Sequence, residues 1–390
     1  MKLKLYYATN RNHLGDNQFA PEGYGIHPSA SGIENLRLGK VTVDTGKESL
    51  NKWFGSKTGA GKGDGVALSA FFKERAKKQA KIVAYQEHIP DPGRAEATQE
   101  GKRLGSEEMF AEIQTTLRQG RDVLIYVHGF NVSWWDAVGS ALALKAMLNH
   151  QKNSAQKNKD VLVVLFSWPS DGSALPFAAY RSDRTEAIGS GFALGRGFLK
   201  LRDFLAEATR PPTEQESKNK NGKKWEPCLQ NINVLCHSMG NYVFEHALQR
   251  MIEQSTTRRL PRIFDNVFLC SPDVDDNVLE TDQPLNRLPE ICRNISIYYN
   301  RGDLALRGSD ITKGNPDRLG TNGTADPSHL HPKVSQIDCS DIVDGLMEHS
   351  YYLKGRINTD IRMSLDNVAQ EAKERARKPS AKLPNVYTMR

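Results

Sequence analysis

The sequence predicts an α/β fold, in which a mostly parallel central sheet is flanked by helices. Continuous apolar runs such as 122–130 and 161–169 have the composition of strands that are buried on both faces. Helical patterns separate these runs, and strands that alternate with helices are typical of parallel sheets covered on both sides. Polar residues of catalytic type follow several of the runs, at the carboxyl edge where such sheets carry their chemistry.

The first 105 residues are predicted to form an N-terminal extension with extra strands and a flexible loop. Strands are predicted at residues 3–10, 36–44 and 81–90, because these segments are rich in β-branched and aromatic residues. The stretch Gly59-Ala60-Gly61-Lys62 lacks the spacing of a phosphate-binding loop, so it is predicted to be a linker. We expect residues 45–105 to hold a lid or an extra subdomain.

The main domain is predicted to span residues 106–378, with strands and helices alternating regularly from residue 121, and a basic tail follows at 379–390. Its first helix begins at the N-cap Ser106, presents apolar side chains four residues apart and ends at Gly120. Further helices are predicted at 134–148, 183–208, 240–252 and 358–377. The strands between them are predicted at 122–130, 161–169, 232–236, 263–273, 294–303 and 334–341.

The composition is that of a soluble globular protein, with 38% hydrophobic and 25% charged residues in a chain of 390. No run of about 18 apolar residues occurs, so no membrane-spanning helix is predicted. The N-terminus is too short and too polar for a secretory signal, so we expect a cytoplasmic protein. The five cysteines are odd in number and widely spaced, and we expect them to be reduced core residues.

The formal net charge is +7, and two basic runs, 218–224 and 373–382, contribute to it. We expect these runs to be a solvated loop and a flexible tail. Their charge would allow weak contact with an anionic membrane, whereas no recognised nucleic-acid-binding motif is present and no specific nucleic-acid partner is expected. Because no H-x-x-H, H-E-x-x-H or clustered Cys/His pattern occurs, we expect no metal and no other cofactor.

The stretch INVLCHSMGNYVFEHAL, residues 232–248, places Ser238 between an apolar strand and an amphipathic helix with almost no loop. A nucleophile elbow has this arrangement, with small residues two positions before and after the serine because strand and helix come close there. Gly240 fits the pattern, and Cys236 stands where the pattern has glycine. The alternative is a serine that only caps the helix.

Further motifs occur in order along the chain: YATNR near the start, then VHGFNVSWWDA, LFSWPSDG, YRSDR, CHSMGN, DNVFLCSPDVD, YYNRGDLAL and MEHSYY. With them the sequence resembles the α/β-hydrolase superfamily, and more narrowly the bacterial family of α/β-hydrolases of unknown function. The resemblance leaves out about residues 50–105 and the basic tail. It implies the α/β-hydrolase fold, with residues 106–378 as the catalytic domain.

The resemblance also implies the order nucleophile, acid, histidine, and hence the triad Ser238, Asp303 and His349. Asp303 ends the predicted strand 294–303, and His349 follows the last predicted strand of the main domain. Two other acids, after the preceding strand, remain alternatives: Asp273 and Asp275. The remaining histidines after the serine are His246, His329 and His331.

An oxyanion hole is expected from two backbone N–H groups near the serine. One is that of Met239, the residue after the nucleophile, and the other belongs to the loop HGFN that follows an early strand. Phe130 is the preferred donor in that loop and Asn131 the second. His128 is expected to hold the loop through a side-chain hydrogen bond.

Together these residues predict a serine hydrolase that cleaves an ester, thioester or amide through an acyl-enzyme, most simply a carboxylesterase acting on a small-molecule or lipid ester. One alternative is a lipase or phospholipase that works at an anionic membrane. Another is a non-catalytic binding protein with the same fold. In YRSDR, Arg181 or Arg184 would either bind an anionic substrate group or form a salt bridge that anchors the loop. The sequence does not indicate an oligomeric state.

Overall fold

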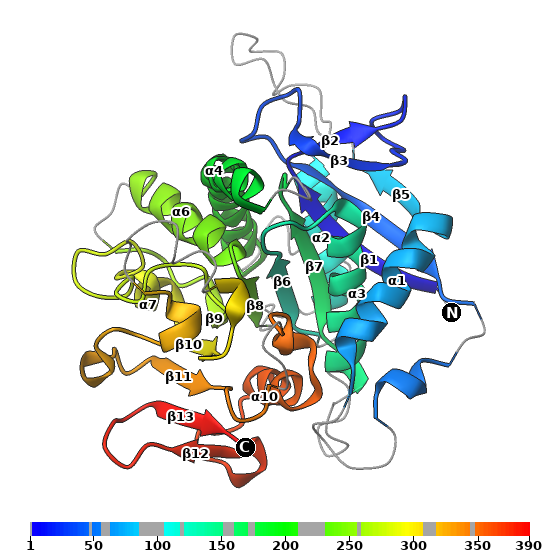
Figure 1. Ribbon diagram of the computed structural model, residues 1–390. Coiled ribbons are helices and arrows are strands. Elements are labelled where there is room, and N and C mark those ends of the chain that lie inside the picture. Colours follow the sequence, from blue (N-terminus) through cyan, green and yellow to red (C-terminus); the bar gives the residue numbers. More distant parts are fainter. Residues whose placement is uncertain are drawn as a thin grey trace, which may run out of the picture.

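The computed structural model describes residues 2–46, 49–55, 63–85, 105–117, 121–150, 160–170, 176–209, 231–255, 259–306, 317–343 and 348–390. An 11-stranded sheet runs through its centre (Figure 1). In the order of the sheet, the strands are β12 (Arg377–Pro379), β13 (Val386–Met389), β11 (Val334–Asp338), β10 (Cys292–Tyr299), β9 (Phe264–Cys270), β8 (Ile232–His237), β6 (Val123–Val127), β7 (Leu162–Ser167), β1 (Lys2–Thr9), β4 (Arg37–Asp44) and β5 (Lys81–Ala84).

The sheet is parallel from β13 through to β1, and its outermost strands β12, β4 and β5 pair antiparallel. Every residue of β6, β7 and β8 is buried, which is the reason that these strands read as unbroken apolar runs. The side chains of Leu124 and Tyr126 belong to one hydrophobic core and those of Val123, Ile125 and Val127 to the other. The predicted α/β class, with its antiparallel N-terminal strands, is confirmed.

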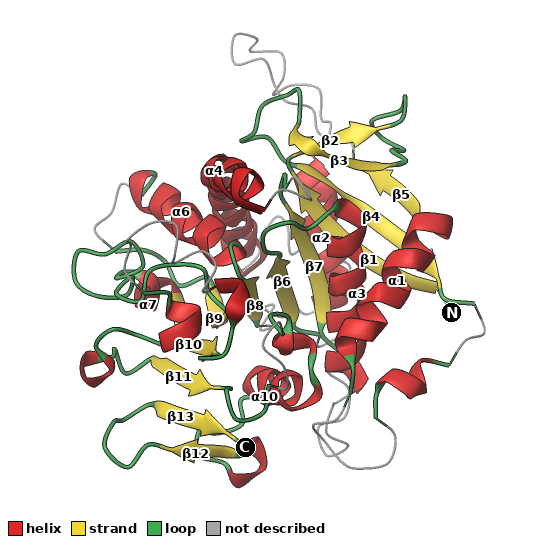
Figure 2. Cartoon of the chain, viewed as in Figure 1, coloured by secondary structure: helices red, strands yellow, loops and turns green. Residues whose placement is uncertain are grey.

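Helices cover both faces of the sheet (Figure 2). One face carries α1 (Gly65–Gln79), α3 (Trp134–His150) and α10 (Gly355–Leu365), and the other carries α2 (Gly105–Leu117), α4 (Pro176–Thr209) and α6 (Gly240–Glu253). None of the described helices is both long and apolar enough to span a lipid bilayer. The smaller elements are β2 (Arg11–Leu14), β3 (Gly23–Pro28), α7 (Leu288–Ile291), α9 (Leu319–Asn322), η1 (Leu50–Trp53), η3 (Pro327–His329), η4 (Tyr351–Leu353) and η5 (Lys373–Arg375).

Helix α1 was not predicted, although it lies in the region expected to hold a lid or extra subdomain. Asp64 caps its first turn by accepting a hydrogen bond from the N–H of Ala67, and Leu68, Phe72 and Ala76 are buried at four-residue steps. This helix packs on α3 and so covers the sheet. The Gly59-Ala60-Gly61-Lys62 stretch and the basic run 218–224 lie outside the described residues.

The C-terminal segment differs from the helix and flexible tail expected for it. The helix predicted at 358–377 ends at Leu365, and Asn367 then turns the chain with a positive φ of 56°. The residues beyond form β12 and β13 at the edge of the sheet. Residues 379–390 are therefore part of the folded sheet edge.

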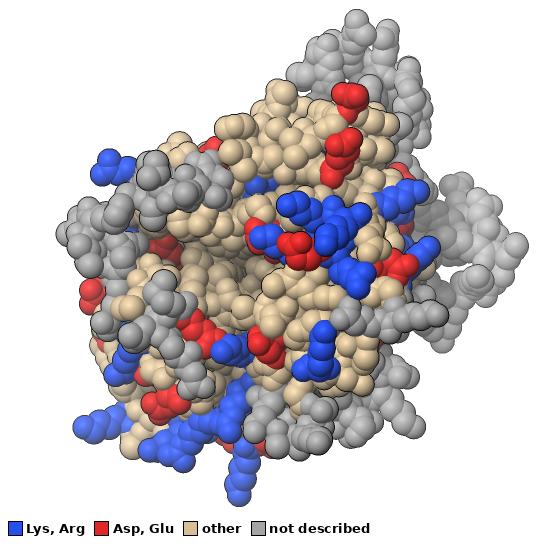
Figure 3. Space-filling view, turned by 45° about the vertical axis from the view of Figure 1, so that its right-hand side comes forward, with Lys and Arg blue, Asp and Glu red and all other residues tan. Residues whose placement is uncertain are grey.

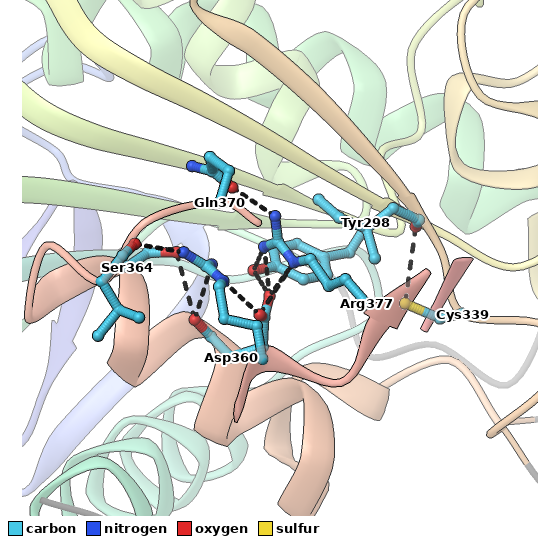
Figure 4. Close-up of polar contacts among 9 residues, drawn as sticks. Tyr298, Cys339, Asp360, Ser364, Gln370 and Arg377 are labelled. Atoms are coloured by element: carbon cyan, nitrogen blue, oxygen red, sulfur yellow. Dashed lines mark hydrogen bonds and ion pairs between the residues drawn. The ribbon is translucent and has the colours of Figure 1, made fainter. Parts of the chain in front are cut away.

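Two arginines of the supposed tail are held inside the protein by Asp360 of α10 (Figure 4). The Asp360 carboxylate accepts hydrogen bonds at 2.9 Å from Nε of Arg375 and from Nε of Arg377, and at 2.6 Å from the hydroxyl of Tyr298. The side chain of Arg377 is only 1% exposed. A run of charged residues is usually expected to be solvated. Here the buried carboxylate of Asp360 holds two of its arginine side chains inside the protein instead.

The cysteines agree with their predicted role. Cys236, Cys270, Cys292 and Cys339 are free and buried, and Cys228 lies outside the described residues.

Candidate active site

The turn from β8 into α6 holds Ser238 in a left-handed backbone conformation, with a φ of 52°. A non-glycine residue in this region is strained, and strain of this kind is concentrated at functional positions. A Cβ atom on Gly240 would lie 2.6 Å from the carbonyl oxygens of both Val127 and His128, so only glycine fits there. The elbow expected from the sequence is therefore present.

The backbone of Ser238 is fixed from three sides. Its N–H donates to the carbonyl oxygen of Cys270 at 3.0 Å. Its own carbonyl oxygen accepts from Asp273 N at 3.2 Å and from Asn241 Nδ2 at 2.9 Å. The Ser238 hydroxyl, in contrast, makes no hydrogen bond to any described residue, His349 included.

The HGFN loop after β6 lies directly against the serine. A Cβ atom on Gly129 would come within 2.7 Å of Ser238 Cβ, so glycine is required for this approach. His128 Nε2 faces the backbone N–H of Trp168 at 3.2 Å and must accept from it, so the ring proton lies on Nδ1. That Nδ1–H donates to the carbonyl oxygen of Gly129 at 2.8 Å. His128 thus holds the loop, as expected.

This bond also orients the next N–H. In a trans peptide the C=O of Gly129 and the N–H of Phe130 point in opposite directions, so Phe130 N–H is turned away from His128. Neither Phe130 N–H nor Met239 N–H has a hydrogen-bond acceptor among the described residues. Asn131 N–H, the second candidate, already donates to Asp183 Oδ2 at 3.3 Å. The two preferred donors are the ones left available.

Burial keeps His128 neutral: it places the pKa of the imidazole well below its usual value, and the neighbouring Arg11 lowers it further. Arg11 is itself fully buried, and burial lowers its pKa to about 9. Its guanidinium donates to the carbonyl oxygen of Val132 at 2.7 Å and to Ser167 Oγ at 2.9 Å. The arginine of YATNR therefore braces the HGFN loop.

This bracing role of Arg11 was missed from the sequence. The available signal was the cation in YATNR, which begins β2 just after β1 ends at Thr9 and precedes the loop it supports by more than a hundred residues.

The candidate base and acid meet at the carboxyl edge of the sheet. His349 Nδ1 lies 2.7 Å from Oδ2 of Asp303, whose side chain is fully buried. Asp303 also accepts from the N–H of Ala305 at 3.1 Å. The histidine side chain is 20% exposed, so the ring stays open on its other side.

The competing acids are engaged elsewhere. Asp273 Oδ1 lies 3.4 Å from Nε of Arg318, and its Oδ2 accepts from the Tyr180 hydroxyl at 2.9 Å. Asp275 pairs with the same arginine at 2.5 Å. Neither aspartate has a hydrogen bond or ion pair with His349 within the described part of the chain.

The competing histidines contact residues other than Asp303. His246 stands edge-on to the ring of Tyr242, with 4.6 Å between the ring centroids. His329 is exposed and faces Asp326 at 2.6 Å, and His331 accepts from the N–H of Lys333.

The loop of His349 is tied to the elbow by its backbone. The His349 carbonyl oxygen accepts from His237 Nε2 at 3.1 Å and from Ser271 Oγ at 2.9 Å. The His237 and His349 ring centroids are 4.8 Å apart. Burial, followed by the nearby His349, places the pKa of His237 well below its usual value, so it is neutral. The structure therefore ties the loop of His349, which pairs with Asp303, to the residue that precedes Ser238.

The molecule is hollowed on the face drawn in Figure 3, where mostly uncharged residues line the hollow and charged side chains stand around its rim. No group of three or more His, Cys, Asp or Glu side chains within the described ranges could hold a metal ion.

The pattern that defines the family described as "Alpha/beta hydrolase of unknown function (DUF900)" matches residues 106–204 and 224–358, more than half of the chain. The chain belongs to this family. An uncharacterized protein of Nostoc sp. (strain PCC 7120) is 25% identical over 236 residues, which are 50% of this chain and 55% of that protein. The chain thus spans about half the length of this curated relative.

Two solved structures show a slighter likeness to this α/β hydrolase. The acylaminoacyl peptidase of Pyrococcus horikoshii is 13% identical at a TM-score of 0.30, over 63% of this chain and 36% of that one. The phospholipase PlaB of Legionella pneumophila, in complex with thio-NAD, is 13% identical at a TM-score of 0.26, over 67% and 66%. At these scores neither structure bears on the chemistry of the site.

Proposed function

We propose that the protein is a serine hydrolase that cleaves a carboxylic ester through an acyl-enzyme intermediate. The observation that carries the proposal is the convergence at Ser238. This residue stands on a strained elbow against the HGFN loop. His237, directly before it, holds the loop of His349, which pairs with Asp303. Thioesters and amides present the same carbonyl carbon to such a site and share its chemistry.

In the proposed reaction Ser238 Oγ attacks the carbonyl carbon while His349 Nε2 takes the hydroxyl proton. Asp303 accepts the Nδ1–H, which keeps Nε2 free as the base and stabilises the imidazolium. The carbonyl oxygen becomes an oxyanion that the N–H groups of Phe130 and Met239 would bind. Collapse expels the alcohol, which takes the proton from His349. Water then repeats the sequence on the acyl group, releasing the acid and restoring the hydroxyl.

The first step requires the Ser238 side chain to turn toward His349. A rotation about the Cα–Cβ bond moves only the hydroxyl, since the backbone on either side is fixed. Catalytic hydrogen bonds are often loose without substrate and tighten when it binds. The hydrogen bond from the neutral His237 to the His349 backbone would hold the base in position while the hydroxyl rotates.

Labelling with a fluorophosphonate probe tests the nucleophile. We expect the native protein to be labelled and the Ser238→Ala variant not to be. Ser328→Ala is the matched control, because it removes an exposed hydroxyl in the turn before β11. Labelling that survives Ser238→Ala would refute the proposal.

A panel of p-nitrophenyl esters of increasing acyl length, followed by phospholipid vesicles, then defines the substrate class. Turnover of the short soluble esters identifies a carboxylesterase, and turnover confined to vesicles identifies a lipase. No turnover on any of them would favour the alternative of a binding protein with the same fold.

A further inference from the structure

Arg184 of α4 is connected to the candidate nucleophile by three successive contacts. Its Nη1 donates to the hydroxyl of Tyr180 at 3.4 Å, and that hydroxyl donates to Asp273 Oδ2 at 2.9 Å. The backbone N–H of Asp273 in turn donates to the carbonyl oxygen of Ser238 at 3.2 Å. The Tyr180 ring also stands edge-on to Phe130, with 5.7 Å between the centroids. Three successive hydrogen bonds therefore connect Arg184 to the serine.

The guanidinium is held in place by an aromatic ring. Its central carbon lies 3.8 Å from the centroid of Tyr242, which is in the first turns of α6. Tyr242 lies four residues after Ser238 in the sequence. Stacking of this kind orients the planar cation and leaves its edge free for hydrogen bonds.

The charge of Arg184 has no ion-pair partner within the described residues. Asp273, whose charge acts on Arg184, pairs instead with Arg318, as does Asp275. Burial raises the pKa of the neighbouring Glu245 carboxyl to about 7, so Glu245 carries only part of a charge at neutral pH. Among the described residues, the alternative expected for this arginine, a salt bridge that anchors YRSDR, is therefore not found.

A half-buried cation without a carboxylate partner has lost part of its hydration, and a bound anion would compensate for that loss. Nothing in the described part of the chain accepts a hydrogen bond from Nε or Nη2 of Arg184, and these two donors form one side of the guanidinium fork. That side matches the two oxygens of a carboxylate or a phosphate. Arg181 lies in the same helix, where its carbonyl oxygen accepts a hydrogen bond from Thr185. Arg181 is exposed to solvent, whereas Arg184 is half-buried.

We propose that Arg184 binds an anionic oxygen group of the substrate, so that the preferred substrates are esters which carry a carboxylate or phosphate near the scissile bond. The inference rests on the proposed function, which supplies the ester chemistry at Ser238. It names the substrate class that the hydrolase would select.

Matched ester pairs test the proposal. p-Nitrophenyl hemisuccinate and p-nitrophenyl butyrate have acyl chains of the same length and differ in a terminal carboxylate. A second pair, 4-carboxyphenyl butyrate and phenyl butyrate, carries the difference on the alcohol side. For at least one pair we expect Arg184→Gln to reduce the ratio of kcat/KM values, anionic over neutral, roughly 10- to 100-fold, as for loss of a hydrogen bond to a charged group.

Arg181→Gln is the matched control, because it removes the same charge from an exposed position of the same helix. It is expected to keep the native ratio. Arg184→Lys retains the charge without the fork and should restore part of the preference. Thermal unfolding of each variant reports whether the fold is retained. Ratios for both pairs that are the same in Arg184→Gln and Arg181→Gln would overturn the proposal while leaving the nucleophile assignment intact.

Anion binding can also be measured without turnover. If neither pair is hydrolysed, succinate and inorganic phosphate are tested for protection of Ser238 against a neutral fluorophosphonate. Protection that is lost in Arg184→Gln supports the proposal, and whichever anion protects identifies the group. Equal protection in all variants, or none, overturns it. If Ser238 is not labelled, the proposed function fails. Calorimetric titration of the native protein and of Arg184→Gln with the same two anions then still tests whether Arg184 binds them.

Discussion

The carbonyl oxygen of His349 accepts a hydrogen bond from Nε2 of His237, the residue that immediately precedes Ser238. The proposed base is thus anchored to the neighbour of the proposed nucleophile, and Ser271 supplies a second bond to the same oxygen. Because both rings are packed together, a change at His237 would displace the base without removing any reacting group.

Replacing His237 by Phe keeps an aromatic ring and removes the hydrogen bond. We expect kcat to fall roughly 10- to 100-fold with little change in KM, as for a displacement of about 1 Å at a reacting group. His237→Gln retains a side-chain donor and should recover part of the loss. Steady-state kinetics on a p-nitrophenyl ester would measure both effects, and a Phe variant with native kcat would exclude this positioning role.

Replacing Asp303 by Asn tests the acid. The amide leaves the site nearly isosteric but favours the wrong imidazole tautomer, so kcat should fall roughly 10³- to 10⁴-fold. Asp275→Asn is the matched control, since that aspartate was a competing candidate and contacts Arg318 instead. Comparable losses in the two variants would contradict the assignment.

Replacing Gly240 by Ala tests the close approach at the elbow. The added Cβ would lie 2.6 Å from two backbone carbonyl oxygens, which cannot move as a flexible side chain would. We expect a loss of about 1–3 kcal/mol in the free energy of unfolding. In Gly197→Ala the new Cβ meets only the end of Leu36, at 3.2 Å. Urea unfolding should therefore find the control closer to the native stability; equal stabilities would speak against a tight elbow.

Replacing Arg377 by Met tests whether residues 377–389 belong to the fold. The change leaves Asp360 with one arginine in a buried site, and breaking a buried pair costs about 3–5 kcal/mol. Lys378→Met is the control, since Lys378 is exposed on the same strand. Unfolding curves for both variants measure the difference, and a free energy of unfolding unchanged by Arg377→Met would restore the view of this segment as a tail.

The buried neutral histidines predict a dependence of stability on pH. The folded-state pKa of His237 is lowered, so the unfolded chain binds more protons below its ordinary pKa of about 6.5. Its contribution is therefore fully present above about pH 6.5 and is lost as the pH falls toward the folded pKa, at about 1.4 kcal/mol per pH unit.

Carboxyls whose pKa is raised, such as Glu245, change the stability with pH in the opposite direction, so the profile of the native protein alone does not isolate His237. We therefore compare slopes. Between pH 5 and 6, the free energy of unfolding of His237→Phe should change with pH by about 1.4 kcal/mol per unit less than that of the native protein. Parallel pH profiles would show that His237 is not held neutral.

Much of the arrangement could be predicted because it is local. Apolar runs between helical patterns specified the buried parallel strands, and the small residue at Gly240 beside Ser238 indicated the elbow. Helix α1 carried the same kind of signal, a capping aspartate and apolar residues at four-residue steps. It was overlooked because glycine-rich sequence precedes it.

By itself, then, the sequence determined the α/β class and the sharp turn that lifts Ser238 out of β8, since both depend on neighbouring residues. Only the tertiary structure decided which aspartate faces His349. Asp273, Asp275 and Asp303 all follow strand ends, and Arg318 engages the first two. It also decided that the side chains of Arg11 and Arg377 are buried, whereas no described residue accepts a hydrogen bond from one side of the Arg184 guanidinium. The partners of a charge come from residues far away in the chain.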